Sequence, residues 1–140
     1  MKPWKTILLL AITVWMFLTL YGCDLLGVSI EQRIQYFESD LNDANRDDMY
    51  LNFHPTLTAD YGAITGDGTV FDNAFPPADR NYTIIISDQS NTDNVVGIID
   101  ADGGGFGGPL EIYFKMAQDG TDWMIEELRL QGYFPSPIVE

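Results

Sequence analysis

One stretch of the chain decides the fold: DGTDWMIEELRLQGY, residues 119–133. Its Asp-Gly-Thr opening is typical of a tight turn, and the residues that follow are rich in aromatic and aliphatic side chains, as in a β-strand. Three segments further upstream have the same character and are separated by polar or glycine-rich turns. The four expected strands cover residues 82–87, 94–100, 110–117 and 122–131. Because short connections join antiparallel neighbours, the pattern predicts a meander.

The last strand contains an irregularity. Trp123 and Ile125 share one face of it, but strict alternation would turn Leu128 and Leu130 to the other face. A β-bulge at Glu126–Glu127 would return all four apolar side chains to the same side and would also bend the strand. The sequence therefore predicts a strongly curved sheet.

An amphipathic helix is predicted ahead of the sheet. Ser29 is a favourable N-cap, and Gln32 stands three residues later, which is the spacing of a capping box. Apolar residues follow at steps of four, three and four and form one stripe: Ile30, Ile34, Phe37 and Leu41. A helix with one apolar face is expected to pack on another element.

A second short helix is expected at residues 46–53, ended by Pro55, with three side chains on one face: Met49, Tyr50 and Phe53. The segment 56–81 is turn-rich and is interpreted as a loop with one short strand at 69–71. These elements predict an α+β fold, in which one or two amino-terminal helices pack on a curved, mainly antiparallel sheet of four to five strands. No cysteine follows Cys23, so the domain has no internal disulfide and depends on a packed core.

The amino terminus is organised as an export signal. Lys2 and Lys5 precede an uncharged, apolar run at residues 6–22, which is short for a membrane-spanning helix. The run leads into the sequence LYGC, which resembles the lipobox of bacterial lipoproteins, although Tyr21 departs from the small or aliphatic residue usual in that slot. The resemblance implies that a lipid is attached to Cys23 and that the chain is cleaved just before it.

The implied organisation is a signal peptide at residues 1–22, a lipidated tether at 23–28 and the α+β domain at 29–140. An uncleaved signal anchor is the alternative, and in both cases the domain is exported. The lipid would hold it at the cell membrane or the outer membrane, facing the periplasm or the exterior. Cleavage leaves 21 acidic residues against five basic ones, a net charge near −16. Such a surface repels nucleic-acid phosphates and suits cations, a basic partner or simple solvation.

Two stretches resemble the NTF2-like (cystatin-like α+β) superfamily: the helical segment closing on NFHP at residues 52–55, and the closing hairpin at 119–133. The resemblance covers nearly all of the mature chain. It implies a cone, in which the helices cover the concave face of the sheet and the open end can form an apolar pocket. Members include ketosteroid isomerase-type enzymes, dehydratases, polyketide cyclases, protein-transport factors and domains with no known activity, so the resemblance implies a shape rather than one function.

Mostly aromatic and aliphatic residues are the candidates to line such a pocket: Phe37, Leu41, Tyr50, Phe53, His54, Tyr82, Ile84, Tyr113 and Trp123. The alternative is that they fill the cone as an ordinary core. His54, the only histidine, precedes Pro55 at an expected helix end and is interpreted as a cap on backbone carbonyls rather than a general base. Enzymes of the superfamily often pair an Asp or His with a Tyr. Asp60 and Tyr61 are of the right types, but no motif aligns, so no catalytic residue is assigned.

An acidic, glycine-rich run begins at the end of the second expected strand. Asp100, Asp102 and Glu111 occupy positions one, three and twelve of a calcium-binding loop. Position five, which normally supplies a side-chain oxygen, is Gly104, and the flanks have strand character. We interpret the run as a hairpin connection rather than a metal site, and expect no cofactor.

These features favour a non-catalytic, lipid-anchored domain of the cell envelope that binds a partner protein or a small ligand. One alternative is an NTF2-like enzyme or small-molecule carrier with an apolar pocket. Another is a structural envelope component whose acidic surface recruits cations or a basic partner. The sheet also offers a face through which two copies can form a homodimer. A filled cone with an exposed apolar patch would favour partner binding, whereas an open cone with a buried Asp or His facing a Tyr would favour the enzyme.

Overall fold

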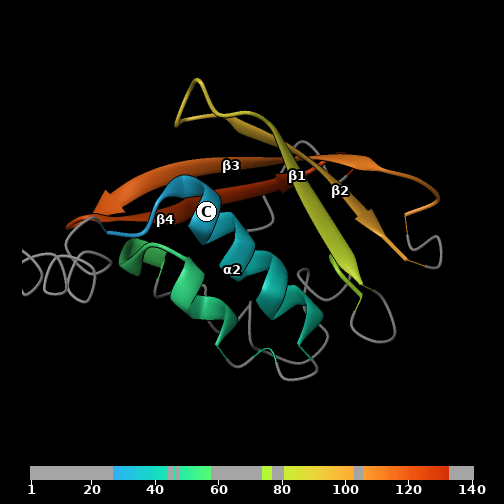
Figure 1. Cartoon of the computed structure of the whole chain (residues 1–140), viewed down its shortest axis with the longest axis horizontal. Coiled ribbons are helices and arrows are strands. Elements are labelled where there is room, and N and C mark those ends of the chain that lie inside the picture. The colour runs from blue at the N-terminus through green and yellow to red at the C-terminus, as the bar shows by residue number, and fades with distance from the viewer. Residues whose placement is uncertain are drawn as a thin grey trace, which may run out of the picture.

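Four strands form one antiparallel sheet in the order β1-β2-β3-β4 (Figure 1). In the computed structural model they are β1 (Tyr82–Asp88), β2 (Val95–Ala101), β3 (Leu110–Asp119) and β4 (Asp122–Leu130). The structure describes residues 27–43, 46, 48–57, 74–76, 81–102 and 106–132. Several predicted features lie outside the described residues: the export signal with Cys23, the strand at 69–71, Asp60, Tyr61 and Gly104.

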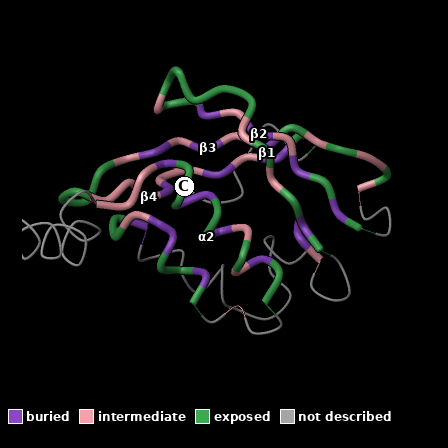
Figure 2. Tube along the Cα trace, viewed as in Figure 1, coloured by how far each residue is buried: buried purple, intermediate pink, exposed green. Residues whose placement is uncertain are grey.

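The predicted α+β architecture is confirmed. One helix, α2 (Ile30–Asn42), packs against one face of the curved sheet (Figure 1). The capping box is present, because Ser29 Oγ accepts from the Gln32 N–H and the Gln32 side chain accepts from the Ser29 N–H. The predicted apolar stripe is the buried face of the helix, from Ile30 to Leu41 (Figure 2).

Arg33 is buried on the same side of α2 as the apolar stripe. Its Nε donates to the Trp123 carbonyl at 2.8 Å and its Nη1 to the Leu51 carbonyl at 3.1 Å. Burial lowers the pKa of the Arg33 guanidinium, because removal from water disfavours the charged form. The two carbonyls compensate for the lost water and connect the helix to β4.

The second short helix predicted at residues 46–53 is present but is shorter than predicted and is of the 3₁₀ type. The segment forms a 3₁₀ helix, Met49–Asn52, and a second 3₁₀ helix, Pro55–Leu57, follows it. A 3₁₀ helix has three residues per turn, so Met49 and Asn52 share the buried side and Tyr50 faces outward. Pro55 begins a helical turn instead of ending one, as suits a residue with a fixed φ and no N–H.

The predicted bulge in the last strand is confirmed at Glu126. Lys115 of β3 lies opposite Glu127 and Met116 lies opposite Ile125, so Glu126 is the extra residue. On the far side of the bulge the buried residues resume as Leu128 and Leu130. The inserted residue therefore keeps the apolar side chains of β4 turned toward α2.

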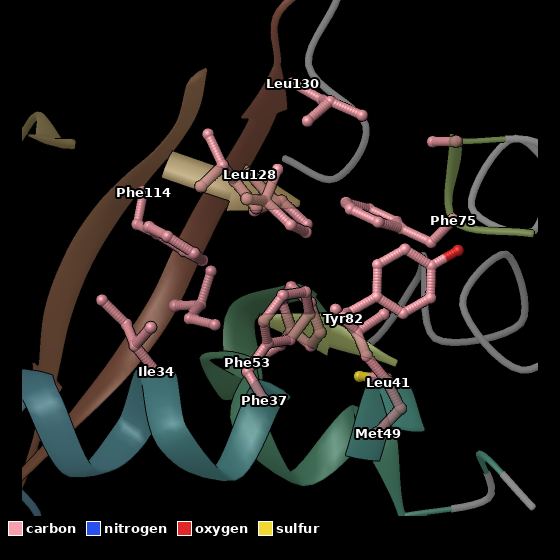
Figure 3. Packing of buried hydrophobic residues seen from close by; sticks show 14 of the residues in the cluster. Ile34, Phe37, Leu41, Met49, Phe53, Phe75, Tyr82, Phe114, Leu128 and Leu130 are labelled. Atoms are coloured by element: carbon pink, nitrogen blue, oxygen red, sulfur yellow. The ribbon is translucent and has the colours of Figure 1, made fainter. Parts of the chain in front are cut away.

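The core is organised around Phe37, which projects from α2 toward the sheet (Figure 3). Its ring makes edge-to-face contacts with Phe53 at 6.0 Å, Phe75 at 6.1 Å and Phe114 at 5.8 Å between centroids. Edge-to-face packing places the positive rim of one ring against the negative face of another. Four aromatic rings from separate segments are thus held in one cluster.

The β4 edge of the sheet is bonded to two other segments of backbone. The Trp123 N–H donates to the Val28 carbonyl at 2.9 Å, just before α2. The His54 N–H donates to the Ile125 carbonyl at 2.8 Å, and Phe53 forms a parallel bridge with Ile125. Both segments therefore continue the sheet beyond its last strand.

The β1 edge is bonded to side chains of α2 instead. Asn42 contacts both backbone groups of Tyr82: its Nδ2 donates to the carbonyl at 2.9 Å, and its Oδ1 accepts from the N–H at 2.6 Å. Glu38 Oε2 accepts from the Ile84 N–H at 2.6 Å. The last two turns of the helix thus supply hydrogen bonds that a neighbouring strand would otherwise provide.

Deletion of Glu126 is expected to destabilise the domain strongly. Without the extra residue, Leu128 and Leu130 would turn to the outer face, and exposing two buried leucines costs about 3–6 kcal/mol. Urea unfolding followed by circular dichroism measures the change. The matched control, Glu126→Ala, keeps the residue count and loses only the ion pair with Lys115, worth about 0–1 kcal/mol. Equal stability of the two variants would contradict this role of the bulge.

Candidate functional site

The predicted pocket residues of the inner layer belong to the packed core. Phe37, Leu41, Phe53 and Tyr82 are all buried (Figure 3). The Tyr82 ring lies against Phe75 and its hydroxyl donates to the Pro76 carbonyl at 2.7 Å. Ile84 and Trp123 are partly buried and pack against the same cluster. Among the described residues, these side chains pack against one another on the inner face of the sheet.

Two of the predicted lining residues lie elsewhere. Tyr50 is 39% exposed, because of the 3₁₀ geometry described above. Tyr113 is on the opposite side of the sheet, since its neighbours Ile112 and Phe114 are buried and side chains alternate along a strand. Neither tyrosine can line a pocket beneath α2.

His54 is hydrogen-bonded to the helical turn that follows it. Its Nδ1 accepts a hydrogen bond from the Thr56 N–H at 3.3 Å and lies 2.9 Å from Thr56 Oγ1. The side chain therefore caps the start of the 3₁₀ helix Pro55–Leu57. The local sequence His-Pro, with proline at a first helical position, is the signal that indicates this role.

The three acidic residues considered as calcium ligands each accept a hydrogen bond from a different donor. Asp102 Oδ2 accepts from Asn81 Nδ2 at 3.2 Å, Asp100 Oδ1 accepts from the Ala101 N–H at 2.8 Å, and Glu111 accepts from the Tyr113 hydroxyl. In the part of the chain that the structure describes, no group of three or more His, Cys, Asp or Glu residues is placed to hold a metal ion.

The outer face of the sheet, opposite α2, carries an apolar patch that crosses three strands. Ile85 of β1 lies opposite Ile98 of β2, and Val96 of β2 lies opposite Tyr113 of β3. Directly opposite side chains on one face are in contact range. Ile85 is 66% exposed, the highest value among the large hydrophobic side chains that the structure describes. We call Ile85, Val96, Ile98 and Tyr113 the outer patch.

Charged residues continue the outer face next to this patch. Lys115 Nζ lies 2.8 Å from Glu126 Oε2, and Arg129 Nε pairs with Glu127. These groups border a hollow of about 490 Å³, lined by Asp93, Asn94, Tyr113, Phe114, Lys115, Glu127 and Arg129. The surface therefore combines an apolar area with ion pairs at its border.

Two ionisable groups of the hollow, Lys115 and Tyr113, are hydrogen-bonded to carboxylates. The hydrogen bond to Glu126, together with that carboxylate's charge, raises the pKa of Lys115, so its ammonium stays protonated. The hydrogen bond to Glu111 raises the pKa of the Tyr113 hydroxyl. A protonated lysine and a neutral tyrosine donate hydrogen bonds but do not abstract protons. This arrangement offers hydrogen-bond donors and charged groups to a binding partner.

Sequence reasoning missed the outer patch. The segment YTIIISD contains three consecutive isoleucines, and in a strand one of them must face away from the other two. That run is the signal that indicates an apolar residue on the outer face. The β-branched residues predicted the strand, but the isoleucine that faces outward was not identified.

Comparisons of the chain with protein-family models, with curated proteins and with solved structures find no match. Within the described ranges, which begin at Gly27, no helix is long and apolar enough to cross a membrane. The inference of function therefore depends on the surfaces of the domain itself.

Substitution of His54 separates a capping role from a chemical one. His54→Asn is expected to stay within about 0.5 kcal/mol of the parent, because an Asn side chain also accepts from the N–H two residues on, whereas His54→Ala should lose about 1 kcal/mol. Thermal unfolding of the three proteins provides the comparison. If asparagine destabilised the domain as much as alanine, the cap would not be what His54 contributes.

Proposed function

We propose that this chain is an exported lipoprotein whose domain, of the NTF2-like kind, binds a partner protein through the outer face of its sheet and carries out no catalysis. The observation that carries the proposal is the exposure of Ile85 in an apolar patch, on the face that α2 does not cover. Exposed apolar area with polar surroundings is typical of protein contact sites.

The packed cluster on the inner face supports binding at the outer surface over an internal pocket. A carrier or an enzyme of the cone type needs open space beneath the helices, with a polar group directed into it. Here Phe37 occupies the centre of that layer and contacts three other rings. The hydroxyl of Tyr82 is hydrogen-bonded to the Pro76 carbonyl. No specific contact favours the enzyme or the small-molecule carrier.

The composition of the outer face suits a protein partner. Interfaces commonly have an apolar or aromatic centre and a polar rim, and here the outer patch adjoins the Lys115–Glu126 and Arg129–Glu127 pairs. Most of the Ile85 side chain is exposed to solvent. A partner that covers it therefore buries apolar surface without first displacing other side chains. Pairs of opposite charge at the border add selectivity, because a partner with mismatched charges is repelled.

The membrane anchor is the second element of the proposal. It is supported by the basic head, the apolar run and the single cysteine at the end of LYGC. Attachment to a bilayer concentrates the domain at the surface where an envelope partner would be found.

Cys23→Ala should remove both lipid attachment and cleavage at this site, because the thiol is the attachment point. Metabolic labelling with a palmitate analogue, followed by electrophoresis, is expected to label the parent chain and leave the mutant unlabelled at the size of the precursor. Cys23 is the only cysteine, so no second thiol complicates the result. A mutant that still takes up the label would refute the assignment.

A photo-crosslinking amino acid tests the outer patch in cells. p-Benzoylphenylalanine at Ile85 is expected to give a covalent adduct, because the patch is covered by a partner. At Tyr36 it should give none. Tyr36 is the matched control, since it is aromatic, 50% exposed and located on α2, away from the patch.

The mass of the adduct identifies the kind of partner. Twice the mass of the chain indicates a homodimer through the sheet, and any other discrete mass indicates a different protein. Adducts of similar yield from Ile85 and Tyr36, or none from Ile85, would contradict binding through the outer face.

A further inference from the structure

The amino-terminal end of the described chain is bonded to the turn between β3 and β4 (Figure 1). The Val28 N–H donates to Asp122 Oδ1 at 2.9 Å, and the Val28 carbonyl accepts from the Trp123 N–H at 2.9 Å. Val28, predicted as part of the tether, is therefore hydrogen-bonded to the domain on both of its backbone groups.

Gly27 extends this contact by one residue. Its φ is +69°, a conformation that side chains disfavour, and a Cβ at this position would lie 2.0 Å from the Thr121 carbonyl oxygen. Only glycine allows the chain to run so close to the turn. The amino-terminal end of the described chain therefore lies against the β3–β4 turn.

The distance from this point to Cys23 is short. Three residues separate Gly27 from Cys23, and four extended residues span at most about 14 Å. β3 extends from Asp119 at the turn to Leu110 at its other end, a length of about 30 Å for a strand of this size. A lipid on Cys23 therefore lies near one end of the sheet and far from the other.

We infer that the β3–β4 turn is the membrane-facing end of the domain, that it lies against lipid headgroups, and that the sheet stands away from the bilayer. The inference rests on the lipid anchor proposed above. Its partner is the headgroup layer, and the surface that meets it is the turn Asp119–Asp122 together with Gly27.

Carboxylates lie on both broad faces and also at the turn, which carries Asp119 and Asp122, so the short tether and not charge selects this posture. The α2 side presents Glu31 and Glu38, and the outer face presents Glu111 and Glu127. An end-on posture leaves both faces in solvent, and with them the outer patch.

The chain carries a natural probe for this orientation. Trp4 and Trp15 precede Cys23, so Trp123, directly after the turn, is the only tryptophan of the processed chain. The test uses residues 23–140 coupled through the single thiol of Cys23 to a maleimide headgroup lipid, in phosphatidylcholine vesicles that contain a dansyl-headgroup lipid. Energy transfer from tryptophan to dansyl reports the distance to the headgroups.

The comparison variant is W123F/F106W, which moves the tryptophan to the connection between β2 and β3, at the far end of β3. Transfer is expected to be several-fold stronger from Trp123 than from the variant. Phe106 is partly buried against the core, so the variant's melting temperature is checked first, and W123F/L110W replaces it if the first does not fold. Equal transfer at both ends, or stronger transfer from the far end, would overturn the orientation.

Thiol coupling separates this result from the proposed anchor. If the natural chain fails to float with membranes while the coupled chain shows strong transfer from Trp123, the natural lipid anchor is refuted and the end-on geometry is supported. If the natural chain floats but the coupled chain shows equal transfer at both ends, the anchor stands and the orientation is wrong.

Discussion

Pairing of β3 with β4 depends on one inserted residue, and the rest of the domain depends on that pairing. Glu126 lies between Ile125 and Leu128, and the bulge it makes turns the apolar side chains on both sides of it toward α2. The Ile125 carbonyl, one step before the bulge, accepts the His54 N–H and so fixes the 3₁₀ segment against the sheet. One residue thus determines both which side chains form the core and where the second helical segment attaches.

The two faces of the sheet have separate roles, and alternation along the strands enforces the separation. Ile112 and Phe114 are committed to the inner layer, so Tyr113 between them is necessarily on the outer one. The inner layer is packed ring against ring around Phe37. Any change there costs packing energy, whereas the residues of the outer patch can change with little effect on the fold. Recognition is therefore better placed on the outer face than inside the domain.

Sequence reasoning located most of the secondary structure, because the relevant signals are local. The capping box needs only Ser29 and Gln32, and the bulge follows from a break in the alternation around Glu126. The candidate site was harder, because it depends on which face of each strand is covered. Tyr113 alternates with Ile112 and Phe114, and the local sequence does not say which of the two sets faces α2. The packing of Phe114 against Phe37 decides it. His54 needed knowledge of the 3₁₀ turn after it, a structure with weak sequence preferences.

The hydrogen bonds between α2 and β1 bear on how densely such a domain can be crowded. Proteins confined to a surface meet one another in two dimensions, and an open strand edge would then be a template for linear polymers. Asn42 is hydrogen-bonded to both backbone groups of Tyr82, and Glu38 accepts from the N–H of Ile84. These side chains take the place of a neighbouring strand but offer no backbone to which a further strand could pair. The helix thereby ends the hydrogen-bonded ladder along this part of β1, and neighbouring copies lack a free template there for growth into fibres.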